Sequence, residues 1–115
     1  MEIKDFYGLV HADYEGTLTR LMNDRLINKY VRKFPGDPSF GELTAALEIK
    51  DWNTAFRSAH TMKGVCANLG FTELQKASSE LTEALRGGKE LTDFSLYESV
   101  KREYEFLIDA IAKLD

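Results

Sequence analysis

Apolar residues recur at three- and four-residue steps along most of this chain. The first long run is Leu18, Leu21, Met22, Leu26, Ile27, Tyr30, Val31 and Phe34. This spacing places the side chains on one face of a helix, whereas a half-buried strand would alternate apolar and polar residues. We therefore predict helical structure over residues 18–34, interrupted or recapped at Asn23 or Asp24, and a short lead helix over residues 3–10.

Capping and turn residues divide the rest of the chain into four further helices. The pair Ser39 and Glu42 predicts a capping box at the start of the first of them, just after Pro35 and Pro38. The next helix is expected over residues 52–68, and Gly70 signals its end. Asp51 is the expected cap of this helix. Thr72 is expected to cap a further helix that runs to residue 86, and the last helix is expected to start near Thr92 or Asp93.

These elements predict an all-α fold, an antiparallel four-helix bundle with N-terminal accessory helices. A chain of 115 residues fits a single domain over residues 1–115. We expect the core bundle at about 39–115 and the N-terminal helices, about 3–34, packed on it. Hydrophobic residues at 43% and charged residues at 30% are typical of a chain that folds alone.

The charge balance argues against a nucleic-acid partner. The net charge is −4, although residues 14–34 carry five basic residues against two acidic ones. We interpret that basic stretch as a solvated helix face. No apolar run approaches the roughly 20 residues that span a bilayer, so no membrane association is expected.

Cysteine and histidine usage favours a reducing compartment. The lone Cys66 cannot form an intramolecular disulfide, and the N-terminus lacks the zones of a signal peptide. A cytoplasmic location follows as the expectation. With only His11 and His60 besides that cysteine, a zinc site is not expected.

Residues 52–69 carry the candidate chemistry. On a wheel of about 100° per residue, His60 points away from the side that we assign to the core. That core side holds Ala55, Ala59, Met62, Val65, Cys66 and Leu69. Because Cys66 lies on it, a Cys–His nucleophile pair is not expected. The outer face near His60 holds Asn53, Arg57, Gly64 and Ala67, with Lys63 one turn on and Phe56 at the boundary, where it could equally belong to the core.

Gly64 requires an explanation. A glycine inside a helix costs roughly 1 kcal/mol relative to alanine. One explanation is that the missing side chain lets a partner surface approach the imidazole of His60. The other is that it lets a second helix of this chain pack closely, and the spacing alone does not choose between them.

An outward histidine beside a lysine suits phosphoryl chemistry. Imidazole has an ordinary pKa of about 6.5, so a neutral ring with a nucleophilic nitrogen is available near pH 7. Lys63 could balance the charge of an added phosphoryl group. A turn near residue 71 places residue 82 opposite residue 60, so the Thr82 hydroxyl could orient the ring, with Ser79 and Glu83 as neighbouring alternatives.

The string AHTMKGVCANLGF, residues 59–71, resembles the signature of histidine-containing phosphotransfer (HPt) domains. The resemblance implies that His60 accepts a phosphoryl group on Nε2 from a receiver-domain phosphoaspartate and passes it to the aspartate of a response regulator. It also implies that Lys63 balances the phosphate charge and that Gly64 leaves the histidine accessible. Thr82 stands where many members carry a glutamine that bonds the imidazole, so this chain departs from the pattern there.

The resemblance implies a carrier in a two-component phosphorelay and not an enzyme. No Gly-rich phosphate loop or nucleotide pocket is evident, and no cofactor is expected, since Mg²⁺ would be bound by the receiver domain. Two alternatives remain: a phospho-accepting domain of a chemotaxis-type histidine kinase, and a non-phosphorylated helical docking adaptor. Met1 favours a complete protein.

The surface around His60 is expected to dock receiver domains, and the chain is expected to be a monomer so that this surface stays free. Phe56 and Ala67, with Leu9 or Val10 from the lead helix, would supply apolar contacts. Polar contacts would come from Asn53 and Arg57. The other notable side chains are interpreted as surface or capping (His11) and as packing (Trp52, Tyr97 and Tyr104).

Overall fold

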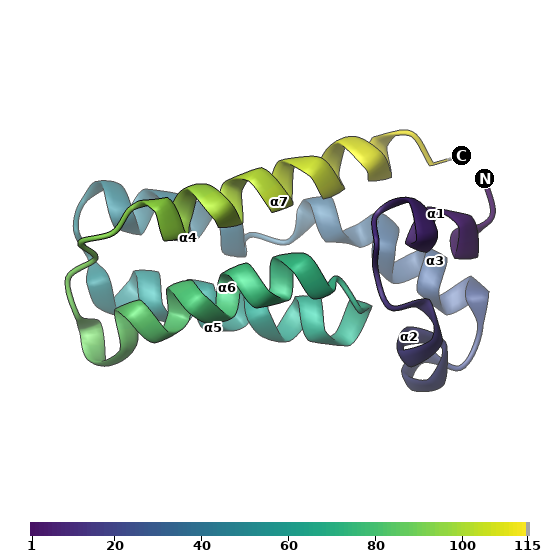
Figure 1. Ribbon diagram of the computed structural model, residues 1–115, viewed down its shortest axis with the longest axis horizontal. Coiled ribbons are helices and arrows are strands. Elements are labelled where there is room, and N and C mark those ends of the chain that lie inside the picture. Colours follow the sequence, from purple (N-terminus) through teal and green to yellow (C-terminus); the bar gives the residue numbers. More distant parts are fainter. Residues whose placement is uncertain (115) are drawn as a thin grey trace.

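The computed structural model describes residues 1–114, and these are helical with no strand among them (Figure 1). The helices are α1 (Ile3–Leu9), α2 (Tyr14–Leu21), α3 (Asp24–Lys33), α4 (Ser39–Glu48), α5 (Trp52–Leu69), α6 (Thr72–Leu85) and α7 (Ser95–Ala112). Two short 3₁₀ turns, η1 (Phe34–Gly36) and η2 (Arg86–Gly88), follow α3 and α6. The all-α prediction is confirmed.

Four of these helices form an elongated bundle, and the first three lie across one end of it (Figure 1). α5 and α6 form the central hairpin, α4 packs on α5, and α7 packs on α6. The N-terminal helices α1–α3 lie beyond the α5–α6 turn. The arrangement is an antiparallel four-helix bundle with N-terminal accessory helices, as predicted.

Apolar stripes from all seven helices meet in one core. Leu43, Leu81 and Val100 are fully buried within the bundle, and Phe6, Tyr7 and Ile27 are fully buried at the N-terminal end. Burial raises the pKa of the Cys66 thiol to about 12, so this cysteine stays protonated. The predicted packing residues Trp52, Tyr97 and Tyr104 are half-buried at the edge of the core.

The helix that carries the candidate site is fixed at both ends. At its start the Asp51 carboxylate accepts the Thr54 N–H at 3.2 Å, as predicted. At its end Gly70 adopts a left-handed conformation with φ 72°. A side chain there would collide with Thr17, whose Oγ1 would lie 2.2 Å from an added Cβ. The sequence therefore needs glycine at this turn.

Three long-range hydrogen bonds attach the accessory helices to this same end of α5, and in one of them the Arg20 Nε–H donates to the Asn68 carbonyl at 3.2 Å. The Tyr7 hydroxyl donates to the Leu69 carbonyl at 2.6 Å. The Asp13 N–H donates to the Gly70 carbonyl at 2.8 Å. Burial raises the pKa of Tyr7 to about 12, so its hydroxyl remains a donor throughout the physiological range.

Capping at the other helix starts agrees with the predictions in one place and differs in three. Asn23 caps α3 by accepting the Leu26 N–H at 2.9 Å, as one of the two expected residues. Ser39 is not a cap, because the Asp37 carboxylate accepts the Ser39 N–H at 2.9 Å and Ser39 becomes the first residue of α4. The N-cap position of α4 is occupied by Pro38 and has no side-chain cap hydrogen bond, so the predicted Ser39–Glu42 capping box does not form.

The starts of α6 and α7 also differ from the predictions. Thr72 is the first residue of α6, and its hydroxyl donates to the His11 carbonyl at 3.3 Å instead of capping its own helix. α7 begins at Ser95, two to three residues later than expected. The Asp93 carboxylate accepts the Ser95 N–H at 3.0 Å, which orders the turn before the helix.

Candidate functional site

His60 lies in the middle of α5 with its side chain exposed. The opposite side of the helix is buried as the wheel predicted, at Ala55, Ala59, Met62, Cys66 and Leu69. Val65 is the exception, since it is only half-buried. It lines an open groove with Tyr30 and Phe34, because α3 and η1 do not close over that side of α5.

The imidazole of His60 is supported on one side only. The ring of Phe56, one turn earlier, lies 6.0 Å from it between centroids and is inclined by 38°. No hydrogen bond joins the His60 ring to any of residues 1–114. Phe56 is itself half-buried, so it contributes one face to the core and one to the surface beside His60.

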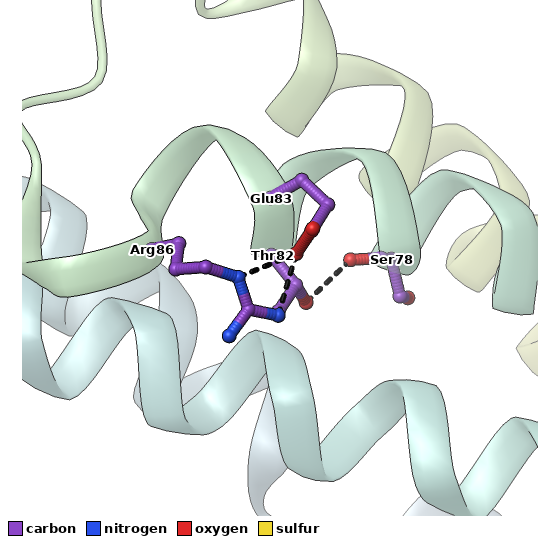
Figure 2. A network of polar contacts seen from close by, with 4 residues as sticks. All are labelled: Ser78, Thr82, Glu83 and Arg86. Atoms are coloured by element: carbon purple, nitrogen blue, oxygen red, sulfur yellow. Dashed lines mark hydrogen bonds and ion pairs between the residues drawn. The ribbon is translucent and has the colours of Figure 1, made fainter.

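Arg86 lies over the ring of Phe56. Its guanidinium carbon lies 5.4 Å from the Phe56 ring centroid, a cation–π arrangement. The same guanidinium donates to Glu83, from Nε at 2.8 Å and from Nη2 at 2.6 Å (Figure 2). α6 and η2 thus bring a cation and a carboxylate to the surface that carries His60.

Lys63 lies one helical turn after His60 and is half-buried. The pKa of Glu83 is lowered, mainly by its hydrogen bonds from Arg86 and also by the charge of Lys63. Lys63 and Arg86 therefore act on the same carboxylate.

The structure decides between the two explanations of Gly64. The residue is exposed, and a Cβ added there would have nothing within 4 Å. No helix in the described part of the chain packs against it, so close helix packing does not explain the glycine. Access to His60 is the explanation that is left, and it stays a prediction that the structure does not test.

Substitutions at Gly64 should separate stability from access. Gly64→Ala is expected to raise the free energy of unfolding by about 1 kcal/mol, because alanine favours the helix and meets no neighbour. Gly64→Gln should also be tolerated by the fold, yet its side chain would project beside His60 and slow phosphoryl transfer from a protein donor. Chemical denaturation and transfer kinetics measure the two effects. A Gly64→Gln variant that transfers as fast as the wild type would remove the access role.

The structure does not place Thr82 beside the imidazole as an orienting group. Thr82 is fully buried, and its hydroxyl donates to the Ser78 carbonyl at 2.6 Å (Figure 2). A short β-branched side chain on the inner face of α6 satisfies its donor locally. Of the alternatives, Glu83 is bonded to Arg86, and Ser79 lines a shallow surface groove with Lys63.

The residues expected to contact a partner differ in exposure. Asn53 and Arg57 are exposed, and Ala67 is half-buried. Arg57 donates to the Thr54 hydroxyl at 3.0 Å, which holds it along the first turns of α5. The backbone of η2 passes close to Asn53, since a Cβ at Gly88 would lie 2.3 Å from its Oδ1.

Val10 does not belong to the surface around His60. It is buried and lines a hollow with Glu73 and Phe106, between the start of α6 and α7. Leu9 is exposed on α1, beyond the α5–α6 turn and more than two helical turns from His60. The lead helix folds back across the end of the bundle, which the local sequence pattern does not reveal.

The role of Arg86 was not anticipated, although the sequence held a signal for it. Residues 56 and 86 share the same midpoint, 71, as residues 60 and 82, so the hairpin places Arg86 opposite Phe56.

Residues 1–114 contain no group of three His, Cys, Asp or Glu side chains suited to a metal ion. None of the helices in that range is long and apolar enough to cross a membrane.

Comparison with known proteins agrees with this geometry. A family model described as the Hpt domain matches residues 37–114, about two thirds of the chain. The match begins just before α4 and extends past the end of α7, so it covers the four-helix bundle and includes His60. No curated protein and no solved structure matched the chain.

Proposed function

This chain belongs to the Hpt domain family, which serves histidine phosphotransfer in phosphorelays, and from that premise we propose that His60 is the phosphoryl acceptor. It takes the group from an aspartate of a receiver domain and passes it to the aspartate of a response regulator. The observation that carries the proposal is the exposed His60 on α5, with Lys63 one turn on and no side chain at Gly64.

The proposed transfer uses the neutral imidazole as nucleophile. The lone pair of Nε2 forms a bond to phosphorus while the bond from phosphorus to the aspartate oxygen breaks, and that electron pair stays on the carboxylate. The proton on Nδ1 remains on the ring. In the second transfer a carboxylate of the next receiver attacks phosphorus, and Nε2 leaves with its lone pair.

In this proposal the chain supplies a positioned nucleophile and a nearby cation, and the receiver supplies Mg²⁺ and the remaining groups. The protein then works as a carrier without kinase or phosphatase activity and without a cofactor of its own. We place it in the cytoplasm as a monomer, because the face around His60 must remain free for two partners in turn.

The docking surface that we propose surrounds His60. Phe56 and Ala67 supply apolar contact and Gly64 permits close approach, while Asn53 and Arg57 supply polar contacts at the edge. Such a small apolar centre with a polar rim suits a transient complex, which must release its partner after each transfer.

The proposed function is tested by incubating the protein with phosphorylated receiver domains and measuring its intact mass at neutral pH, where phosphohistidine survives. We expect a mass increase of one phosphoryl group, located on His60 by peptide fragmentation. If several receivers give no increase while a chemotaxis-type kinase with ATP does, the chain is a direct kinase substrate. If neither does so, the docking adaptor is favoured.

Lys63→Ala should shorten the lifetime of the phosphorylated protein by about fivefold, the effect expected for a charge interaction at a half-exposed position. The phosphoryl group would lose its neighbouring cation while the fold keeps its core. Loss of phosphate over time by intact mass measures the change. Lys113→Ala, at an exposed lysine just after α7, is the matched control and should keep the wild-type lifetime. Equal lifetimes for Lys63→Ala and the wild type would remove Lys63 from the site.

A further inference from the structure

The carboxylate of Glu83 is paired with Arg86, whose guanidinium lies over the ring of Phe56, one helical turn before His60. Arg86 donates two hydrogen bonds to one of its oxygens, at 2.8 Å and 2.6 Å (Figure 2). The charge of Lys63 also acts on Glu83, and both cations hold its pKa below the ordinary value of 4.5. An acidic side chain thus pairs with the Arg86 cation, which lies over the aromatic ring beside His60.

The ring of Phe56 lies between His60 and Arg86, the partner of Glu83. The Arg86 guanidinium carbon lies 5.4 Å from the ring centroid of Phe56, and that ring lies 6.0 Å from the ring of His60. Phe56 is half-buried and fixed by the core on its inner side. The guanidinium is therefore held over the Phe56 ring, one helical turn before His60, and its two hydrogen bonds to Glu83 set its direction.

We propose that Glu83 is a positioning residue that holds Arg86 while His60 is unmodified and competes with the phosphoryl group for this cation afterwards. This inference rests on the proposed function, because it requires a phosphoryl group on His60. Glu83 then weakens the phosphohistidine state and favours transfer of the phosphoryl group to the next receiver.

The exposure of the Glu83–Arg86 pair suits such a competition. The two side chains are 60% and 56% exposed, and exposed ion pairs hold their partners only weakly. A phosphoryl group carries a charge of about −1.5 to −2 at neutral pH, more than a carboxylate, and has three acceptor oxygens. It can therefore attract Arg86 away from Glu83 without a change in the fold, although the negative charge of Glu83 still opposes it.

The test measures the lifetime of phosphohistidine after phosphorylation with phosphoramidate, a small donor that needs no docking surface. Glu83→Gln is expected to lengthen the half-life about two- to fivefold, the range that an exposed charge interaction supports. Glu83→Asp keeps the charge and should stay near the wild-type value. Glu105→Gln, at an exposed glutamate on α7, is the matched control for loss of one negative charge and should not differ from the wild type.

A second variant background shows whether Glu83 acts through Arg86. In the Arg86→Gln background, Glu83→Gln should lengthen the half-life less than it does in the wild type, because the cation that it would release is absent. The inference would be overturned if Glu83→Gln lengthened the half-life in the Arg86→Gln background as much as in the wild type. It would also be overturned if Glu83→Gln alone left the half-life unchanged or shortened it. Both results would leave His60 as the acceptor. Failure of the wild type to take any phosphoryl group from phosphoramidate or receivers would overturn the proposed function and the inference together.

Discussion

Replacing His60 by glutamine should abolish phosphoryl acceptance and leave the fold intact. Glutamine has no nucleophilic nitrogen, because the lone pair of its amide is delocalised into the carbonyl, so no bond to phosphorus can form. The side chain at this position is exposed and makes no hydrogen bond to residues 1–114, so its loss should change the free energy of unfolding by less than about 0.5 kcal/mol. Intact mass at neutral pH and thermal unfolding measure the two outcomes.

His11→Gln provides the matched control, since His11 is the other histidine and is also exposed. That variant should still take one phosphoryl group. Phosphorylation of His60→Gln at the wild-type level would show that another residue is the acceptor. Unfolding of His60→Gln would contradict the outward placement of its side chain.

Phe71→Ala should lower the free energy of unfolding by about 3–5 kcal/mol, the usual loss when a large aromatic side chain is deleted from a core. Phe71 follows the glycine of the α5–α6 turn and is 1% exposed. Its ring lies 5.2 Å from that of Phe34 and 6.0 Å from that of Tyr7, so it joins the hairpin to the accessory helices. Because a small domain has only about 5–15 kcal/mol of stability, this single change threatens the fold.

Chemical denaturation of the purified variants measures this loss. Phe94→Ala is the control, because Phe94 is 48% exposed and its truncation should cost less than about 1 kcal/mol. Equal denaturation midpoints for Phe71→Ala and the wild type would contradict the placement of Phe71 in the core.

Features of the sequence that depend on local geometry were predicted well. The limits of α5 follow from an N-terminal Asp51 and a left-handed Gly70, both of which satisfy backbone groups within a few residues. The exposure of His60 follows from helical periodicity alone, because Met62 and Cys66 on the opposite side must be buried. Such predictions need no knowledge of distant residues.

Features that depend on competition between neighbours were not predicted. Ser39 was expected to cap α4, and only the folded chain shows that it is the first residue of the helix, with its N–H donated to the Asp37 carboxylate. Thr82 lies opposite His60 in the hairpin, yet its rotation about the α6 axis turns it into the core. The side-chain conformation of Arg86 on Phe56 depends on two elements at once, and hairpin register gives only their proximity.

The unanchored ring of His60 has a consequence for conformational entropy. An imidazole without hydrogen bonds to residues 1–114 can rotate about χ1 and χ2, limited mainly by the Phe56 ring on one side. Aligning Nε2 with an incoming phosphorus atom then freezes these rotations in the encounter complex, at a cost of roughly 0.5–1.5 kcal/mol. In the proposed function, the bound receiver would therefore set the orientation of the nucleophile in each complex, so that one histidine could adapt to the different geometries of a donor and an acceptor.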